Sequence, residues 1–406
     1  MFKPRPLAAA VAAVGALALA ACGSSTGGGS SAGGSTRQPP PKVAMAQKVG
    51  PGEGQLNVIA WAGYAEDGSN DPTQDWVHPF EKQTGCKVNV KVANTSDEMV
   101  TLMHTGDYDV VSASGDATLR MVYSGDVAPV NTALVPNYAT VFPFLKDRDW
   151  NSVEVGGKRQ MYGIPHGWGA NLLMWNEGVV KNAPTSWSAV FDPKSPYKGK
   201  ITAYDSPIYI ADAALYLMKT KPDLGIKNPY ALDDKQFKAA VDLLKQQRTV
   251  VGEYWADYTK EVQAFESGTS VVGTTWQVIT NLVQADKKVK VQAIVPSENS
   301  TGWSDTWMVS SKTKHPNCSY QWMNYIISPK VNAQVASWFG EAPAQSGACA
   351  QPGMAEHCKT YHAADKAYSD NIYYWTTPTK ACLDGRTNVT CVDYSKWTQA
   401  WTEIKG

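Results

Sequence analysis

The sequence has no excess of charge of either sign, because 37 Lys and Arg residues balance 37 Asp and Glu residues in a chain of 406. A nucleic-acid-binding protein is expected to carry a basic excess, so the composition argues against that class. Beyond the N-terminus no apolar run approaches the ~20 residues that a membrane-spanning helix needs, which excludes a polytopic membrane protein. Phe is scarce (8) and Trp abundant (15), and Trp offers an N–H group and a strong cation-binding face.

The folded part of the sequence also lacks the motifs of common enzyme classes. It contains no Gly-x-Ser-x-Gly elbow, Walker loop, His-Glu-x-x-His or Gly-x-Gly-x-x-Gly. The six His residues are scattered; His166 lies in a segment that could border a cleft, although a lone His is more often structural. We therefore predict neither enzyme activity nor a cofactor. The length and the 43% hydrophobic content predict two or three domains with a substantial core.

The N-terminus has the pattern of an export signal. Lys3 and Arg5 precede a short apolar stretch, so we predict that residues 1–21 form a signal peptide. Leu19-Ala20-Ala21-Cys22 resembles the bacterial lipobox, which predicts lipid attachment to Cys22; an ordinary secretory signal with a chance Cys is the alternative. Residues 22–54 are rich in Gly, Ser and Pro and are predicted to be a flexible tether. The folded body would then lie outside the cell membrane.

The charge balance changes when the first 54 residues are set aside. They carry five of the 37 basic residues and one of the 37 acidic residues, which leaves 32 against 36 and a net charge of −4. This mild acidity favours a cationic ligand over an anionic one.

Six cysteines remain after Cys22, and an even number in an exported protein indicates disulfides whose connectivity the sequence leaves open. Cys349 and Cys358 are close in sequence, as are Cys382 and Cys391, and each pair would close a small loop. This pairing would leave Cys86 to meet Cys318. A zinc site at His357-Cys358 and His362 lacks ligand spacing, and oxidised thiols cannot ligate, so no metal is expected.

Hydrophobic periodicity predicts alternating strands and helices. Strands are expected over 56–60, 88–92 and 108–112, with helices around 76–80 and over 97–104 and 117–123. This repeat without hairpin turns predicts a mostly parallel sheet covered on both faces. A second unit has strands over 200–204, 270–275 and 289–295 and helices over 210–219, 233–248, 258–267 and 277–286. A strand (306–310) and two helices (320–327 and 331–339) precede a tail without visible regular pattern.

Several landmarks occur in order along the body. They are Trp61-Ala62-Gly63-Tyr64, Tyr108-Asp109-Val110-Val111 followed by Ser114, Tyr162-Gly163-Ile164-Pro165-His166-Gly167-Trp168-Gly169, Thr185-Ser186-Trp187 and Tyr197-Lys198-Gly199-Lys200 before a strand that ends in Asp205, Val272-Gly273-Thr274-Thr275-Trp276, and Trp303-Ser304-Asp305. Each is weak alone. Together, from Leu56 to about Gln345, they resemble bacterial extracellular solute-binding proteins of the spermidine/putrescine type, which feed ABC importers.

The resemblance implies an α/β, two-lobed, periplasmic-binding-protein-like class II fold. Each lobe would be a mixed, mostly parallel sheet flanked by helices, with two crossover segments as the hinge. Lobe I would comprise residues 55–165 and 302–406, the latter including a disulfide-bonded tail, and lobe II residues 166–301. The resemblance also places Cys86 before a strand of lobe I and Cys318 at the start of a helix that returns to it.

The chemistry of polyamines predicts what their site contains. Each ammonium must exchange its water shell for carboxylates and other acceptors, since an unpaired charge is costly to bury. The methylene chain needs flat walls, and each aromatic face adds ~0.5–2 kcal/mol of cation–π attraction. The candidate walls are Trp61, Tyr64, Trp168, Trp276 and Trp303, and the candidate acids are Asp205 and Asp305. Residues two apart in an extended segment face one side, which pairs Trp303 with Asp305.

The sequence departs from the family at three places. Pro207-Ile208 stand near the expected second carboxylate of lobe II, and Ile279 stands where some members carry an acid. Glu341-Ala342-Pro343 stand where an aromatic residue is common. Glu341, Asp116 and Asp257 are the candidates to supply a missing acid.

The same residues have structural interpretations. A Trp at a strand end is often core, and Asp205 before Ser206-Pro207 could cap a helix. Ser114, at a strand-to-helix junction, could be an N-cap, and the free N–H groups of the following helix could bind an anion.

We therefore predict an extracytoplasmic, lipid-anchored substrate-binding protein that acts as a monomer and delivers a polyamine-like cation to ABC permease subunits in the membrane. Two alternatives remain. The same fold could bind an anion or another small organic solute through Ser114 and the helix from residue 117, or the lobes could serve an envelope enzyme or interaction protein. The absence of a nucleophile–base pair favours binding over catalysis. The sequence does not identify the ligand.

Overall fold

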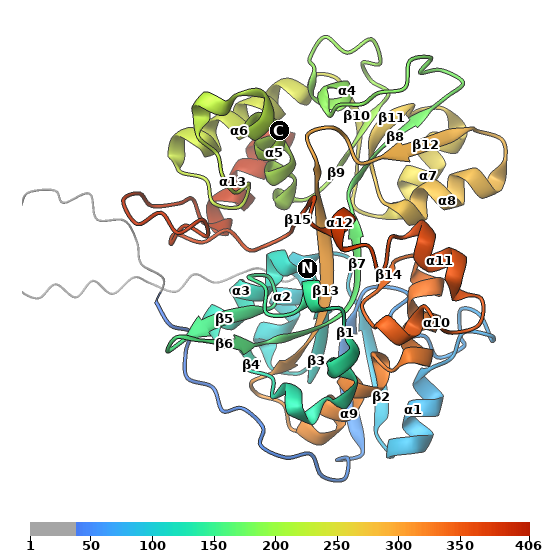
Figure 1. The fold of residues 1–406 in the computed structure, drawn as a ribbon, viewed down its shortest axis with the longest axis vertical. Helices are drawn as coiled ribbons and strands as arrows, with labels where there is room; N and C mark the ends of the chain where they lie inside the picture. The colour runs from blue at the N-terminus through green and yellow to red at the C-terminus, as the bar shows by residue number, and fades with distance from the viewer. Residues whose placement is uncertain (1–37) are drawn as a thin grey trace, which may run out of the picture.

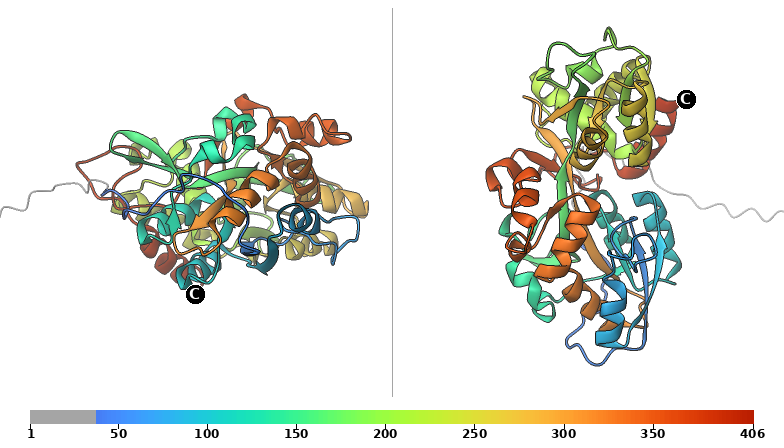
Figure 2. Two further views of the ribbon diagram at one scale, coloured as in Figure 1. Left: turned by 90° about the horizontal axis from the view of Figure 1, so that it is seen from below. Right: turned by 90° about the vertical axis from the view of Figure 1, so that its right-hand side faces the viewer.

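The structure, a computed structural model, describes residues 38–406. Two lobes lie one above the other along the long axis and are joined by long strands (Figures 1 and 2). The predicted signal peptide, Cys22 and the first part of the tether lie outside the described residues. Within residues 38–406 no helix is long and apolar enough to cross a membrane.

The lower lobe in Figure 1 is built on a sheet of eight strands in the order β14-β7-β13-β3-β1-β2, with β4 and β15 paired to β13 beside this path. The strands are β1 Gln55–Ala60, β2 Lys87–Val92, β3 Val110–Ala113, β4 Val127–Ala128, β7 Gly163–Ala170, β13 Ser300–Ser310, β14 Ala342–Pro343 and β15 Ile372–Tyr374. The helices are α1 Val77–Thr84, α2 Ser96–Thr105, α3 Gly115–Ser124, α9 Pro316–Ile326, α10 Pro329–Phe339, α11 Met354–Thr360 and α12 Lys366–Ser369.

The upper lobe is built on a sheet of five strands in the order β10-β9-β11-β8-β12. The strands are β8 Leu172–Asn176, β9 Ile201–Tyr204, β10 Val251–Trp255, β11 Val272–Thr275 and β12 Val291–Ile294. The helices are α4 Ser188–Phe191, α5 Ile210–Thr220, α6 Asp234–Gln247, α7 Tyr258–Ser267, α8 Gln277–Asp286 and α13 Tyr394–Lys405. A separate hairpin of β5 Ser152–Val155 and β6 Lys158–Met161 turns at Gly156 and Gly157, whose positive φ angles suit a two-residue turn.

Both sheets are mixed, as the α/β class predicts. The βα units supply parallel pairs, namely β1 with β2 and β3, and β9 with β10 and β11. The strands that cross between the lobes supply antiparallel pairs, namely β13 with β3 and β7, and β8 with β11 and β12. β13 and β15 form a further parallel pair. Neither direction dominates, although a parallel majority was expected, because the chain enters the upper lobe through β7–β8 and returns through β13.

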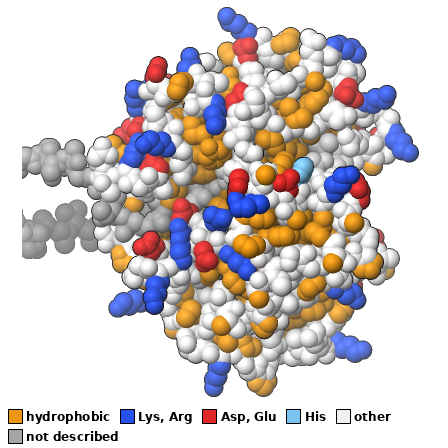
Figure 3. All heavy atoms as spheres, in the orientation of Figure 1, with side chains coloured by type: hydrophobic (Ala, Val, Ile, Leu, Met, Phe, Trp, Pro, Cys, Tyr) orange, Lys and Arg blue, Asp and Glu red, His pale blue; other side chains and the backbone are white. Residues whose placement is uncertain are grey.

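Each sheet has a hydrophobic core on both faces. In the lower lobe, Ile59, Val111 and Met308 pack with α2 and α3 on one face, while Val58 and Trp307 pack with α1, α9 and α10 on the other. In the upper lobe α5, α6 and α13 cover one face, and α7 and α8 cover the other. On the face in Figure 3, acidic and basic side chains are interspersed without a large patch of one sign.

The tail after Gly340 is more regular than predicted. Its last helix, α13, begins after the N-cap Asp393 and buries Trp397, Trp401 and Ile404 at helical spacing. The expectation of a tail without regular structure was therefore wrong. The spacing of these three apolar residues is itself visible in the sequence and indicates a helix. α13 packs in the core of the upper lobe, although the expected division placed 302–406 with the lower one.

The three expected disulfides are present, namely Cys86–Cys318, Cys349–Cys358 and Cys382–Cys391. The first joins the start of β2 to α9 within the lower lobe. The other two close short loops of the tail.

Candidate functional site

The lobes meet where the chain crosses between them. β7 and β8 form one crossing, interrupted at Asn171, and the start of β13 forms the other. The Asn171 backbone N–H donates to the Thr301 carbonyl at 2.9 Å, and Asn171 Nδ2 donates to Thr301 Oγ1 at 2.7 Å. Asn171 Oδ1 accepts a hydrogen bond from Trp276 Nε1 at 2.9 Å. These bonds tie both crossings to the N-cap residue of α8, Trp276, which faces the junction.

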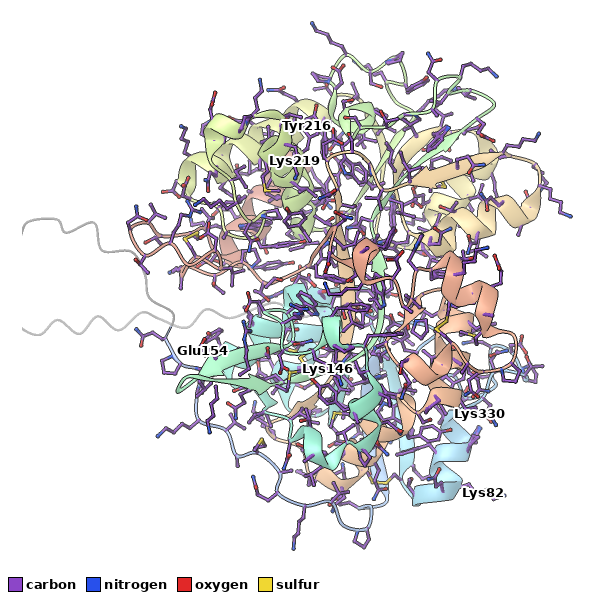
Figure 4. The ribbon with its side chains drawn as sticks, in the orientation of Figure 1. Lys82, Lys146, Glu154, Tyr216, Lys219 and Lys330 are labelled. Atoms are coloured by element: carbon purple, nitrogen blue, oxygen red, sulfur yellow. A yellow bond between two sulfur atoms is a disulfide. The ribbon has the colours of Figure 1, made fainter. Side chains whose placement is uncertain are left out.

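A cavity of about 30 Å³ at this junction combines residues from both lobes and the tail. Its lining consists of one carboxylate, one hydroxyl and six aromatic rings, namely Asp305, Ser114, Trp61, Tyr204, Trp276, Trp303, Phe339 and Trp375. Side chains fill the middle of the molecule in Figure 4, whereas the labelled Lys82 and Lys330 lie at the outer edge of the lower lobe. A larger hollow of about 830 Å³ borders α1, α9 and α10, but its one carboxylate, Asp75, is only half-buried.

Five of the six aromatic rings of the cavity are in contact with one another and form a connected box. The Trp276 ring lies 5.5 Å from Tyr204 and 6.0 Å from Trp303, measured between centroids. Tyr204 stacks on Trp375 at 5.4 Å with an interplanar angle of 17°, and Trp303 meets Phe339 edge-on at 6.1 Å. Such a box offers flat apolar walls and electron-rich ring faces, which suit an alkyl chain that carries positive charge.

Asp305 is the one carboxylate among the lining residues. Its side chain is held by two hydroxyl groups, since Asp305 Oδ2 accepts from Tyr64 OH at 2.7 Å and Oδ1 accepts from Ser114 Oγ. The residue is 3% exposed, and burial raises the pKa of Asp305 to about 6. No Lys or Arg within residues 38–406 forms an ion pair with it. A buried carboxylate without a cation is incompletely compensated, so it favours a positively charged ligand.

Tyr64 and Glu341 adjoin Asp305 but do not line this cavity. The Tyr64 hydroxyl also lies 2.8 Å from Glu341 Oε2, and the Tyr64 ring stacks on Phe339 at 4.1 Å. Glu341 is 0% exposed, and burial raises its pKa well above the usual range. His166 is hydrogen-bonded through Nε2 to Ser112 Oγ at 2.7 Å inside the lower lobe, which fits a structural role.

Five of the ten predicted site residues line the cavity, and two adjoin Asp305. The five are Trp61, Ser114, Trp276, Trp303 and Asp305, and the two are Tyr64 and Glu341. Ser114 occupies the N-cap position of α3 without making a side-chain cap bond, because its hydroxyl bonds Asp305 instead.

Three predicted residues lie elsewhere. Trp168 is fully buried in the lower-lobe core, edge-on to Phe144 at 5.6 Å. Asp205 Oδ1 accepts from Trp401 Nε1 at 3.0 Å and from Lys405 Nζ at 2.7 Å, so it anchors α13 to the upper lobe. Asp116 is buried in the first turn of α3, where it accepts from Ser96 Oγ at 2.9 Å. Asp257, a further candidate acid, caps α7 and is exposed.

Three lining residues were missed by the sequence analysis. Tyr204 directly precedes Asp205 on β9, so the neighbour of the predicted acid is the residue that reaches the site. Phe339 supplies the aromatic residue expected near Gly340, two positions before Glu341. Trp375 comes from the tail after Cys349, and the resembled family has no segment that could be matched to this tail. Across the described chain no cluster of three or more His, Cys, Asp or Glu is placed to hold a metal.

The tail also covers the start of α3, where the sequence allowed an anion to bind the free N–H groups of the helix. Thr377 Oγ1 accepts from the Leu119 N–H at 3.1 Å, and the Thr377 N–H donates to the Gly115 carbonyl at 3.1 Å. The Trp375 backbone lies so close to Gly115 that a Cβ atom there would clash. This contact requires glycine at position 115. The N-terminal end of α3 is therefore covered by the tail of the protein itself.

The buried acids predict an unusual pH dependence for the ligand-free protein. Burial raises the pKa of Asp116 to about 6 and that of Asp212 to about 7. The pKa of Asp305 is raised to about 6 in the same way. An acid with a folded pKa above its unfolded value binds more protons when folded, so stability rises as pH falls between the two values. For Asp305 the full gain is on the order of 3 kcal/mol, and roughly half of it is reached by pH 5. The buried His166 and His357 oppose this trend, because burial lowers their pKa values and the unfolded chain takes up their protons first. We expect the larger number of buried acids to prevail, so that the melting temperature rises from pH 7 to pH 5 by calorimetry; a steady fall would contradict these assignments.

Comparison with known proteins adds a family match and three similar proteins. The family described as bacterial extracellular solute-binding protein matches residues 75–398. The putrescine-binding periplasmic protein PotF of Escherichia coli is 22% identical over 294 residues, which are 69% of this chain and 75% of PotF. The spermidine/putrescine substrate-binding protein PotD of Streptococcus pneumoniae has a similar fold, with a TM-score of 0.63, 18% identity, and coverage of 86% of this chain and 97% of PotD. MotA of A. tumefaciens, solved with glucopine, also has a TM-score of 0.63, with 16% identity and coverage of 87% and 100%.

Proposed function

Because the chain belongs to the family of bacterial extracellular solute-binding proteins, which deliver substrates to ABC importers and are not enzymes, we propose that it captures a small cation of the polyamine class. One ammonium group of the ligand would pair with Asp305, and its methylene chain would lie between the rings of Trp276, Trp303 and Trp375. The fold alone does not select this ligand, since the structurally similar MotA was solved with glucopine.

The buried carboxylate of Asp305 carries the proposal. It faces a cavity walled by six aromatic rings, and its partners within the protein are hydroxyl groups rather than Lys or Arg. An ammonium group would supply the missing positive charge, while the rings would replace part of its water shell. An anion in the cavity would be repelled by the Asp305 carboxylate. The N–H groups at the start of α3, the alternative anion site, are covered by Thr377.

We further propose that the lobes open at the crossovers to admit the ligand. The cavity has a volume of about 30 Å³, which is no more than the roughly 30 Å³ that one water molecule occupies in the liquid. A diamine is several times larger, so the present arrangement is a closed one. Hinge closure of two lobes around a ligand is a common mode of capture, and Asn171 and Thr301 are placed to act at the hinge.

The cellular setting is proposed from the N-terminal sequence and the family. Extracytoplasmic location follows from the family. Leu19-Ala20-Ala21-Cys22 supports lipid attachment at Cys22, with residues 22–54 as a tether to the membrane that holds the permease. We also propose that the protein acts as a monomer, with lobe I formed by 55–165 and the chain from 302 to the residues before α13, and lobe II by 166–301 together with α13.

A thermal-shift screen tests the proposed ligand class. We expect putrescine, spermidine or a related amine to raise the melting temperature in a saturable manner, because a ligand that binds only the folded state stabilises it by mass action. Dicarboxylates of matched length serve as controls and should have no effect. Stabilisation by a dicarboxylate, with none by any amine, would refute the proposal.

A further inference from the structure

Glu341 is a buried acid that the family resemblance does not explain. It follows α10 and points into the lower lobe, where its side chain lies against the backbone of Gly167 so closely that a Cβ at Gly167 would clash. Its Oε2 atom lies 2.8 Å from Tyr64 OH, and its Oε1 atom has no hydrogen-bond partner within the described residues. The carboxyl group therefore depends on one phenol.

That phenol is shared between two carboxyl groups. Tyr64 OH lies 2.7 Å from Asp305 Oδ2 and 2.8 Å from Glu341 Oε2. A phenol carries one hydrogen and can donate it to only one acceptor. If both carboxyl groups were ionised, one oxygen would face the phenol oxygen without a proton between them. The contact is satisfied when one carboxyl group is protonated and donates to the phenol, while the phenol donates to the other.

The surroundings supply no alternative positive charge. His166 Nδ1 lies 3.8 Å from Glu341 Oε1, but burial lowers the pKa of His166 to about 3, so its ring is neutral. From α11, His357 Nε2 contacts the Glu341 carbonyl at 2.7 Å, and burial lowers its pKa as well. The other titratable groups that act on this pair are acids or phenols, namely Tyr361 just after α11, Asp116 on α3 and Tyr204 on β9. A second ionised carboxylate would therefore be uncompensated.

We infer that the ligand-free site holds one exchangeable proton on the Glu341–Tyr64–Asp305 chain and that the ammonium group of the ligand takes its place. The proton resides on Glu341, which donates to Tyr64, which donates to the ionised Asp305. When an ammonium binds Asp305, it replaces Tyr64 as a donor to that carboxylate, the Tyr64 hydroxyl turns its hydrogen toward Glu341, and Glu341 releases its proton to the solvent. This inference rests on the proposed function and adds a proton as a second, competing occupant of the site.

Proton exchange gives ligand binding a definite pH dependence. A ligand whose binding releases one proton gains about tenfold in affinity for each unit of pH increase, up to the pKa of the group that loses the proton. An alkyl ammonium titrates near pH ~10, so the ligand keeps its own charge over this range. Acidification should therefore favour release of the amine, although it stabilises the empty protein.

The first test requires no ligand. Infrared difference spectra of wild type minus Glu341→Gln at pH 7 should show the carbonyl stretch of a protonated carboxylic acid. Gln is a neutral substitute of similar shape for a protonated Glu, so this variant should fold. Glu261→Gln is the matched control, because Glu261 is also fully buried, contacts Thr202 Oγ1 at 3.1 Å and lies on α7 outside the site. The carboxylic-acid band of Glu261 should persist in the Glu341→Gln variant. Absence of an acid band assigned to Glu341 overturns the inference.

The second test measures the exchange. Putrescine is titrated by calorimetry at pH 7 in phosphate, PIPES and ACES buffers, whose ionisation enthalpies differ, and the slope of observed against buffer enthalpy counts the protons released. We expect release of a substantial fraction of one proton for wild type and Glu261→Gln, and none for Glu341→Gln. Binding without proton release in wild type refutes the exchange. If no amine binds at all, the proposed function fails, while the infrared result still decides whether Glu341 is protonated.

Discussion

Replacing Asp305 with Asn is expected to lower the affinity for putrescine by about thirtyfold to several thousandfold. Truncating one partner of a buried, hydrogen-bonded charge pair costs ~2–5 kcal/mol, and each 1.4 kcal/mol is about tenfold in affinity. Asn keeps the shape of the side chain and can still bond Tyr64 and Ser114, whose hydroxyl groups can reorient. Calorimetric titration of the variant with putrescine and spermidine measures the effect.

The stability of the Asp305→Asn variant separates a binding role from a structural one. The substitution removes a buried negative charge beside Glu341, so the ligand-free protein should be at least as stable at pH 7 as wild type. Asp257→Asn is the matched control, since Asn is also a good N-cap and Asp257 is exposed. An unchanged affinity together with a lowered melting temperature would show that Asp305 only supports the fold.

Replacing Trp375 with Ala is expected to change ligand preference as well as affinity. Loss of one cation–π wall should weaken putrescine binding by roughly 2- to 30-fold, from ~0.5–2 kcal/mol. Spermidine is longer and can enter the vacated space, so its affinity should not fall in parallel. The Trp375 N–H donates to the Gly302 carbonyl at 2.7 Å, and this backbone bond is retained in the variant. Parallel titrations of the two amines measure the ratio.

A matched control for Trp375→Ala is Trp338→Ala. Trp338 is 39% exposed on α10 and does not line the cavity, although it directly precedes Phe339. The melting temperature of Trp375→Ala should fall, because removal of a buried Trp side chain costs ~3–5 kcal/mol. Equal losses for putrescine and spermidine, or no loss for either, would show that Trp375 does not define the size of the site.

Much of the fold could be predicted from local patterns. The helices α7 and α8 have the predicted bounds, and Asp233 caps α6 with a complete capping box. Sheet direction was predicted less well, since strand order depends on where the chain crosses between lobes. The tail was predicted least well: its cysteines and turn residues indicate irregular structure, although Trp397, Trp401 and Ile404 stand at helical spacing.

The site was predictable only as far as a residue's environment follows from its neighbours in sequence. Trp303 and Asp305 share one side of an extended strand, and both reach the cavity. Asp205 fits the same reasoning, but α13 returns from the end of the chain and pairs with it through Lys405. Trp375 enters by the same long-range packing. Contacts between segments more than 150 positions apart leave no periodic signal that reasoning from one sequence can use.

Native mass spectrometry of the purified full chain tests the central claim most directly. The protein is incubated with an equimolar mixture of putrescine, spermidine, γ-aminobutyrate and succinate, and the bound mass is read from the intact complex. We predict one adduct, with the mass of putrescine or spermidine, that disappears in Asp305→Asn and persists in Asp257→Asn. An adduct of succinate or γ-aminobutyrate without any amine, or an amine adduct that survives unchanged in Asp305→Asn, would contradict capture of a cation at this carboxylate.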